Sequence, residues 1–226
     1  MKLIDAKKCT LCKKCLEVCY AGALELIGKE MSTEEIMLEV LKDVSFYKES
    51  GGGITLSGGE PTLQYKFASS ILDACLNEGI DTALETCGYS QWTNLKVLIQ
   101  RANLILYDIK HMDSGKHKLF TGCSNHLILE NAKKIAMLAK KMVIRVPIIP
   151  TFNDSEGDFI SIIKFVKSLF SVGEIHLLPY HRLGKNKYKL LDRRYVLENL
   201  PSPDQEKMEK LKALAEESGL VTQIGG

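Results

Sequence analysis

The sequence predicts an α/β fold in which helices cover a parallel β-sheet. Segments with strand-like and helix-like patterns alternate along the chain, and the strand-like runs, such as residues 104–107, are almost continuously apolar. Such runs are typical of parallel strands buried on both faces. Polar and glycine-rich residues follow each strand, where α/β folds collect their binding and catalytic groups. This pattern leaves open whether the sheet is a barrel or an open sheet.

Composition narrows the class of protein. The 226 residues, 45% of them hydrophobic and 26% charged, suffice for one sizeable domain with a small appendage. A formal charge of +2 without a long run of like charges argues against nucleic acid or an anionic membrane as the main partner. No apolar stretch approaches the roughly 20 residues that span a bilayer, and no apolar signal core precedes the first cysteine. We therefore expect a cytoplasmic protein.

The chain changes character near residues 28–31, which predicts a cysteine-rich segment over 1–30 and an α/β domain over 31–226. The domain opens with a capping-box pattern at residues 32–35, which predicts a helix running to about Tyr47. Three glycines at 51–53 break the chain before a short β-type run, and Gly79 suits the end of the next helix. The expected strands are 54–56, 82–86, 104–109, 142–149, 174–180 and 221–224, and the expected later helices are 65–78, 92–101, 127–139, 159–169 and 204–218.

The cysteine-rich segment holds four thiols at the spacing C-x2-C-x2-C-x3-C, namely Cys9, Cys12, Cys15 and Cys19. This is the bacterial ferredoxin run, whose thiolates bind a [4Fe-4S] cluster. A zinc knuckle is the less favoured interpretation, because zinc sites usually separate two C-x2-C halves by a longer connection. In two-cluster ferredoxins the fourth cysteine binds the other cluster, and this sequence has no second run. Cys19 therefore either closes a lone cluster or lacks its usual partner.

Several residues after the strands are candidates for ligand binding. Gly58 and Gly59 remove side chains where a ligand could touch the backbone, and Glu60 places a carboxylate there that could receive an ammonium group. On its own, a double glycine before a helix is most often just a turn. Asp108 and Lys110 lie at alternate positions at a strand end, so they should point to the same side, toward a ligand or as a structural ion pair.

Two further candidates lie within or after later strands. Arg145 interrupts an apolar strand, where a buried guanidinium requires a carboxylate or an anionic ligand. His181 follows the strand near residue 180 and could stack on an aromatic ligand or titrate, although a lone histidine is more often a surface or hydrogen-bonded residue.

Four segments together carry a resemblance to a known family: GGGITLSGGEP at 51–61, ETCGY at 85–89, YDIKHMD at 107–113 and LLPYHRLG at 177–184. They closely resemble the activating enzymes of glycyl-radical enzymes, which belong to the radical S-adenosylmethionine (SAM) superfamily. The resemblance runs from about Cys9 to the carboxyl terminus and implies a partial (β/α) barrel of the radical SAM type, with a half-ferredoxin-like [4Fe-4S] segment at the amino end.

The resemblance also implies an activity and a set of site residues. Such an enzyme cleaves SAM reductively and uses the 5′-deoxyadenosyl radical to take a hydrogen atom from a glycine of a partner enzyme, with reduced flavodoxin or ferredoxin as electron donor. Gly58, Gly59 and Glu60 would hold the methionine amino end, and Asp108, Ile109 and Lys110 would line the ribose and carboxylate region. His181 would lie at the nucleoside end, with Arg145 and Thr86 as neighbours.

The sequence departs from the family in one respect. The catalytic cluster of the superfamily is held by C-x3-C-x2-C, and the 226 residues contain no such triplet: Cys15 and Cys19 have the first spacing, but Gly22 occupies the third position. The chain thus looks like the family without its first strand, its catalytic loop and half of its ferredoxin insert, and we expect no catalytic residue and no radical reaction from it alone. The alternatives are a protein that binds SAM or a partner without catalysis, and a small iron–sulfur electron-transfer protein.

Overall fold

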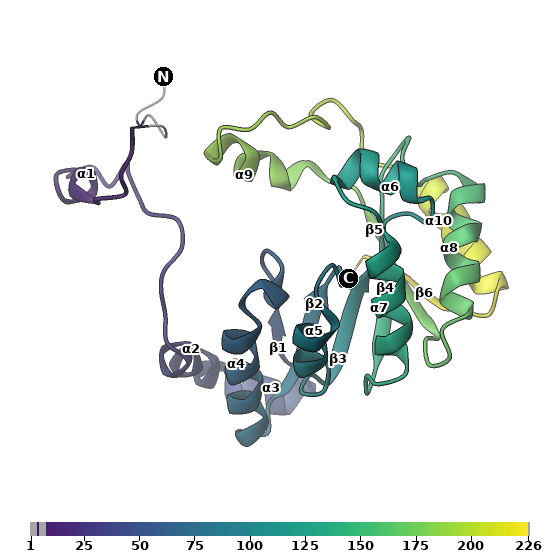
Figure 1. Ribbon diagram of the computed structural model, residues 1–226, viewed down its shortest axis with the longest axis horizontal. Helices are drawn as coiled ribbons and strands as arrows, with labels where there is room; N and C mark the ends of the chain where they lie inside the picture. The colour runs from purple at the N-terminus through teal and green to yellow at the C-terminus, as the bar shows by residue number, and fades with distance from the viewer. Residues whose placement is uncertain (1–3, 5–7, 226) are drawn as a thin grey trace.

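The computed structural model describes residue 4 and residues 8–225. Six parallel strands form one sheet, in the same order as in the sequence (Figure 1). Right-handed crossovers between successive neighbours place every connection on one face, so the sheet curls toward a barrel instead of being wound on both faces. The strands are β1 (Gly53–Leu56), β2 (Asp81–Thr86), β3 (Leu104–Asp108), β4 (Met142–Ile148), β5 (Glu174–Pro179) and β6 (Val221–Ile224).

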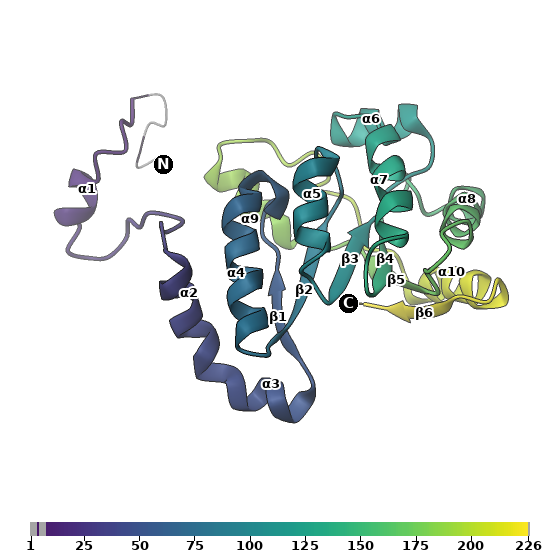
Figure 2. The ribbon, with the colours of Figure 1, turned by 60° about the horizontal axis from the view of Figure 1, so that its bottom comes forward.

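The longer crossover helices lie along the outer side of this curved sheet (Figures 1 and 2). The five longer crossover helices are α4 (Tyr65–Asn77), α5 (Trp92–Ile99), α7 (His126–Ala136), α8 (Glu156–Lys167) and α10 (Gln205–Glu217). The predicted parallel α/β fold is confirmed, and the expected strands differ from the observed ones by at most one residue at either end. The remaining elements are α1 (Lys14–Glu17), α2 (Thr33–Val40), η1 (Leu41–Asp43), α3 (Val44–Ser50), η2 (Pro61–Gln64), α6 (Ser114–Thr121), η3 (Arg182–Gly184) and α9 (Lys185–Leu190).

The predicted capping box is present at the start of α2. The Ser32 hydroxyl accepts from the backbone N–H of Glu35, and the Glu35 carboxylate accepts from the backbone N–H of Ser32 at 2.7 Å. Helical structure continues through η1 and α3 to Ser50, somewhat beyond the predicted end near Tyr47. It ends at Gly51, whose φ of 65° is left-handed and favours glycine.

Three α-helices of the described residues, α1, α6 and α9, were not predicted. Each is short and mostly exposed, so none carries the apolar stripe by which a helix is found in a sequence. The start of α6 is fixed locally instead, because the carboxylate of Asp113 accepts from the backbone N–H of Lys116 at 2.7 Å.

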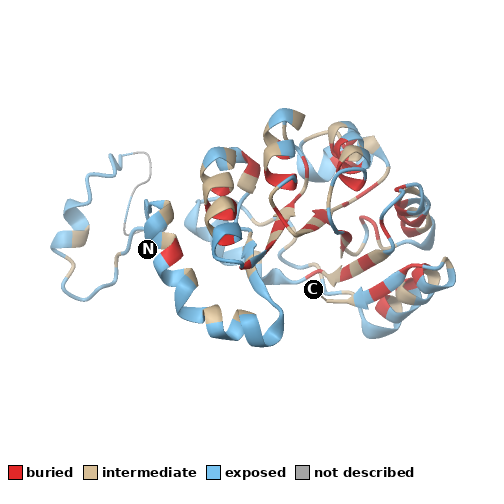
Figure 3. Ribbon diagram, turned by 90° about the horizontal axis from the view of Figure 1, so that it is seen from below, coloured by how far each residue is buried: buried red, intermediate tan, exposed pale blue. Residues whose placement is uncertain are grey.

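The main core lies between the sheet and its covering helices. Figure 3 shows buried residues on the strands and on the helix faces turned toward them. Leu84 and Ile105 of the strands and Leu72, Leu95 and Phe159 of the helices are completely buried, and each such side chain contributes about 1.5–3 kcal/mol. A second cluster joins α2 to α4 through Met37, Ile71, Cys75 and Ile80.

The segment that carries the four cysteines and α1 extends away from the sheet (Figures 1 and 2). Within the described residues, β1 pairs only with β2 and is therefore an edge strand. Among the helices formed by the described residues, none has the length and apolar character needed to cross a membrane.

Candidate functional site

The carboxyl ends of β1 to β4 meet at one cavity of about 260 Å³. Parallel strands end at the same edge of a sheet, so the polar residues that follow each strand come together there. Ten residues line the cavity: Ser57, Gly58, Gly59, Glu60, Glu85, Thr86, Cys87, Asp108, Lys110 and Arg145.

Seven of the nine residues predicted to bind the cofactor line this cavity, and two do not. Ile109 is 1% exposed, because it alternates with Asp108 and Lys110 and its side chain joins the core. His181 is exposed and follows β5, and its Nδ1 accepts from the backbone N–H of Leu183 at 3.3 Å. The cavity also contains Ser57, Glu85 and Cys87, which sequence reasoning placed in the strand-end clusters without assigning them a role.

The floor of the cavity is an ion network centred on Arg145. Its guanidinium lies 2.6 Å from Glu85 and 3.0 Å from Asp108, and Lys110 lies 3.3 Å from Asp108. Burial alone would lower the pKa of Arg145, but the two carboxylates outweigh it and raise that pKa. Arg145 therefore meets the requirement for a carboxylate partner, and Asp108 and Lys110 point to the same side as predicted.

The cavity has a charge imbalance. Glu60, Glu85 and Asp108 supply three carboxylates against the two cations Lys110 and Arg145, which leaves one net negative charge. A ligand with a cationic group fits this balance better than a purely anionic one.

The glycine turn leaves the cavity open on one side. Gly58 has a φ of 117°, which residues with a side chain rarely adopt. A Cβ atom added at Gly58 or Gly59 would meet nothing within 4 Å, so both glycines border free space. The backbone is thus accessible to a ligand at this point.

Three buried asparagines hold the loops around the site, and sequence reasoning missed them. Asn131 donates to the carbonyls of Gly88 and Ser90 after β2, at 2.8 and 2.9 Å. Asn125 donates to the carbonyls of His111 and Met112 after β3. Their only signal in the sequence is an isolated asparagine near or within an apolar helix, which is a weak one.

The third asparagine ties two strand ends together. Asn153 is fully buried and donates to the carbonyls of Lys110 and Pro147, each at 2.7 Å. Its side-chain oxygen accepts from the backbone N–H of Ile149 at 2.8 Å. All the hydrogen bonds that this side chain makes therefore fix the backbone beside Lys110 and after β4.

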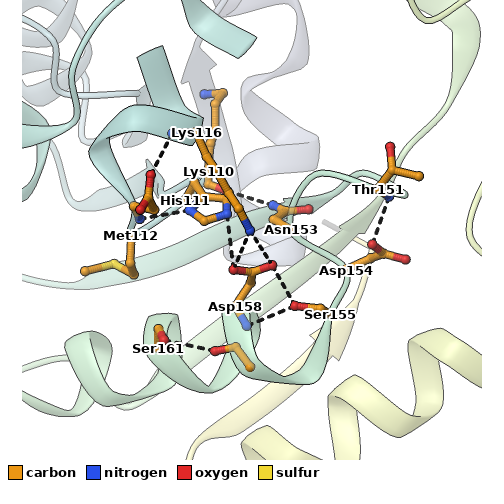
Figure 4. Close-up of polar contacts among 12 residues, drawn as sticks. Lys110, His111, Met112, Lys116, Thr151, Asn153, Asp154, Ser155, Asp158 and Ser161 are labelled. Carbon is orange, nitrogen blue, oxygen red and sulfur yellow. Dashed lines mark hydrogen bonds and ion pairs between the residues drawn. The ribbon is translucent and has the colours of Figure 1, made fainter. Parts of the chain in front are cut away.

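The loop after β3 is fixed further by His111, which is 3% exposed (Figure 4). Its Nδ1 accepts from the backbone N–H of Asp113 at 2.9 Å, and its Nε2 faces the Asp158 carboxylate at 3.4 Å. Lys116 lies 3.1 Å from the same carboxylate. Burial, together with the charge of Lys116, lowers the pKa of His111 despite Asp158, so the ring is neutral near pH 7.

The four cysteines of the ferredoxin run supply the donors for a [4Fe-4S] cluster. Cys9, Cys12 and Cys15 are exposed and Cys19 is partly buried. In the described residues, no three of these thiols come together as a metal site. The chemistry of the donor set fits the cluster, and cluster binding would have to draw the thiols together, as is usual when a metal site forms on binding.

Comparison with known proteins shows the family to which the chain belongs. Residues 17–165 match the radical SAM superfamily model, and residues 2–25 match a 4Fe-4S binding domain. The chain is 42% identical, over 256 aligned residues, to the trans-4-hydroxy-L-proline dehydratase activating enzyme of Clostridioides difficile, covering 99% of this chain and 84% of that protein. The chain belongs to the radical SAM superfamily. Within it, the chain belongs with the activating enzymes of glycyl-radical enzymes.

Other relatives agree with this assignment. The isethionate sulfite-lyase activating enzyme of Oleidesulfovibrio alaskensis is 43% identical over 193 residues, which cover 84% of this chain and 62% of that protein. A crystal structure of a domain of pyruvate-formate lyase-activating enzyme from Bacteroides vulgatus superposes with a TM-score of 0.65 at 30% identity, covering 77% of this chain and 99% of that domain.

A more distant structure supports the fold alone. Streptococcus suis SuiB bound to S-adenosylmethionine superposes with a TM-score of 0.60 at 16% identity, covering 90% of this chain and 43% of that one. SAM and the [4Fe-4S] cluster, which the sequence predicted, are the cofactors of this superfamily. The negatively charged cavity with its open glycine turn suits a ligand such as SAM, whose sulfonium and ammonium groups are cationic.

Proposed function

We propose that this chain serves in the activation of a glycyl-radical enzyme and that it binds SAM at the carboxyl ends of β1 to β4. The observation that carries the proposal is the cavity itself. A glycine turn, three carboxylates and two cations from four successive strands meet there, in a chain that aligns over 99% of its length with a dehydratase activating enzyme.

We assign the parts of SAM to parts of this site. The turn of Gly58, Gly59 and Glu60 receives the methionine amino end. The segment from Asp108 through Ile109 to Lys110 receives the ribose and the carboxylate, with Ile109 acting through its backbone because its side chain is in the core.

Three further residues complete this assignment. Thr86 and Arg145 border the ligand from β2 and β4. His181 follows β5, outside the cavity, and would meet the nucleoside end where it projects beyond β4.

The cysteine-rich segment, residues 1–30, is proposed to hold one [4Fe-4S] cluster on Cys9, Cys12, Cys15 and Cys19. Reductive cleavage of SAM needs a cluster with an open iron site, and its product is the 5′-deoxyadenosyl radical that abstracts the glycine hydrogen. A cluster with four thiolate ligands has no open site, and the 226 residues contain no C-x3-C-x2-C triplet. We therefore propose that these residues alone bind SAM without cleaving it.

The partners follow from the same assignment. They are a glycyl-radical enzyme and, as electron donor, reduced flavodoxin or ferredoxin. A cytoplasmic location is part of the proposal, because all seven cysteines are free and such thiols persist in a reducing compartment.

The test measures 5′-deoxyadenosine formed from SAM under strong reductant. The iron-reconstituted chain is assayed alone and after addition, in cis or in trans, of a segment that carries C-x3-C-x2-C. We expect background product from the chain alone and clear product with the segment. Robust product from the bare chain would mean that the ferredoxin-type run is itself the catalytic cluster.

The same samples separate the two alternative functions. SAM binding with no turnover even after the segment is added would favour a binding protein. Reversible reduction of the cluster without any affinity for SAM would favour an electron-transfer protein.

A further inference from the structure

We propose that Glu60 is a positioning residue, which ties the glycine turn after β1 to the end of β2, and that its carboxylate does not bind the amino group of the ligand. This inference adds detail to the proposed SAM site. It depends on that proposal only for the ligand-binding measurements. It assigns a role to Cys87 that neither the sequence nor the family match supplies.

The carboxylate of Glu60 is surrounded by donors from the protein. Its Oε1 accepts from the hydroxyl of Thr86 at 2.7 Å and from the hydroxyl and backbone N–H of Thr62 at 3.0 and 3.3 Å. Its Oε2 accepts from the backbone N–H of Cys87 at 3.0 Å and from the Cys87 thiol at 3.1 Å.

This arrangement saturates the carboxylate. A carboxylate has about four lone-pair positions, and five donors already occupy them. An incoming ammonium group would have to displace hydrogen bonds that are already made, so it would gain little from Glu60.

Thr86, the last residue of β2, and Cys87, which follows it, are both held as hydrogen-bond donors. Thr86 is 3% exposed, and its hydroxyl oxygen accepts from the backbone N–H of Gly88 at 3.0 Å, which leaves the hydroxyl hydrogen to point at Glu60. Burial, together with the nearby charge of Glu60, raises the pKa of Cys87 to about 11. The thiol therefore keeps its proton and remains a donor across the physiological range.

A second tie reinforces the first. The hydroxyl of Ser57 donates to the carboxylate of Glu85, so the turn is bound to β2 on both sides of Gly58. Gly58 keeps its unusual φ between these two ties. The result is a turn whose backbone is already in place when the ligand arrives, which lowers the entropy cost of binding.

Two ligands distinguish positioning from direct binding. S-adenosylhomocysteine carries the amino group, and its desamino analogue, with the same thioether, carboxylate and nucleoside, does not. The dissociation constant of each is measured by calorimetry with the full chain and with Glu60→Gln. Because the amide of Gln cannot accept from all five donors, we expect Glu60→Gln to raise the dissociation constants of both ligands by the same factor, about tenfold.

The side chain of Cys87 provides the second arm. Cys87→Val removes the thiol donor and should weaken the binding of both ligands severalfold. Cys87→Ser keeps a donor and should bind both ligands as tightly as the parent does. In the Glu60→Gln background, Cys87→Val should have no further effect. An S–H stretching band lowered in wavenumber in the parent, and shifted back in Glu60→Gln, would report the hydrogen bond directly.

The protein without ligand provides the third arm. Glu60→Gln and Cys87→Val should each lower the unfolding midpoint by a few degrees and should be non-additive, while Glu49→Gln, at an exposed carboxylate in α3, should change nothing.

Two outcomes would overturn the inference. One is Glu60→Gln weakening S-adenosylhomocysteine alone and leaving its desamino analogue unchanged, which is the result expected for direct contact with the ammonium group. The other is that the decreases in unfolding midpoint caused by Glu60→Gln and Cys87→Val add up in the double variant. If the parent chain binds neither ligand, the proposed SAM site fails and the stability cycle alone decides the role of Glu60.

Discussion

Asp108 on β3 and Arg145 on β4 occupy paired positions in the sheet, and two guanidinium nitrogens of Arg145 lie 3.0 Å from the same Asp108 oxygen. The same guanidinium contacts Glu85 on β2. The positive charge of Arg145 thus compensates for the repulsion between two carboxylates from neighbouring strands on the floor of the cavity. Without it, their charges would repel each other in a partly buried place.

The first prediction concerns Arg145. Arg145→Met should destabilise the protein by about 2–3 kcal/mol, because it leaves the partly buried Glu85 without its cation and Asp108 with Lys110 alone. Urea denaturation measures the change. Lys141→Met, which removes an exposed partner of Glu174, serves as the control and should cost less than about 1 kcal/mol. Equal effects of the two substitutions would contradict the central place given to Arg145.

The second prediction concerns the stability of the protein at acidic pH. Burial raises the pKa of Glu85, but hydrogen bonds from Arg145 and Ser57 and the charge of Arg145 outweigh it and lower that pKa below its ordinary value of 4.5. A lowered pKa in the folded state means that the contribution of Glu85 to stability is complete above about pH 4.5 and is lost as the pH falls further. The free energy of unfolding, measured from pH 6 to pH 3, should decline less steeply in Arg145→Met than in the parent.

The third prediction concerns Asn153, which holds the backbone beside Lys110. Asn153→Ala should cost about 2–4 kcal/mol, because it leaves three partly buried backbone groups without the Asn153 side chain as their partner. It should also weaken S-adenosylhomocysteine binding, since the loop that carries Lys110 loses its support. Asn77→Ala, at an exposed position in α4, is the matched control. Full ligand affinity in folded Asn153→Ala would show that this tie does not shape the site.

The fourth prediction concerns iron. Anaerobic reconstitution should give about four irons per chain on Cys9, Cys12, Cys15 and Cys19, because no other thiols have suitable spacing. Cys12→Ser should reduce this content, whereas Cys123→Ser should leave it unchanged. Iron and sulfide analysis decides the matter, and about eight irons per chain would refute the assignment of a single cluster.

The fifth prediction compares two glycines. A Cβ atom at Gly88 would lie 1.8 Å from the hydroxyl of Tyr107, and the φ of Gly88 is 68°. Gly88→Ala should therefore destabilise the protein by more than about 2 kcal/mol. Gly157, in α8, has free space around it, so Gly157→Ala should stabilise the protein by up to about 1 kcal/mol. Thermal unfolding of the two variants is the measurement.

The sequence by itself determined the order and kind of the long elements. Apolar runs such as 104–107 and 142–144 predicted buried strands, and the capping box at Ser32 predicted the start of α2, because these signals are local. The ferredoxin spacing and the strand-end motifs were equally local, and they carried the family assignment. The short, mostly exposed helices α1, α6 and α9 were not predicted, because they have no apolar stripe to reveal them.

The tertiary structure decided what the candidate residues do. It joined Arg145 to Glu85, 60 residues away, and it brought donors at the end of β2 to Glu60, which no spacing rule could connect to it. It also placed the side chain of Ile109 in the core and His181 outside the cavity. The physical reason is that hydrogen bonds and burial depend on which strands become neighbours, and the pairing of strands is a property of the folded sheet.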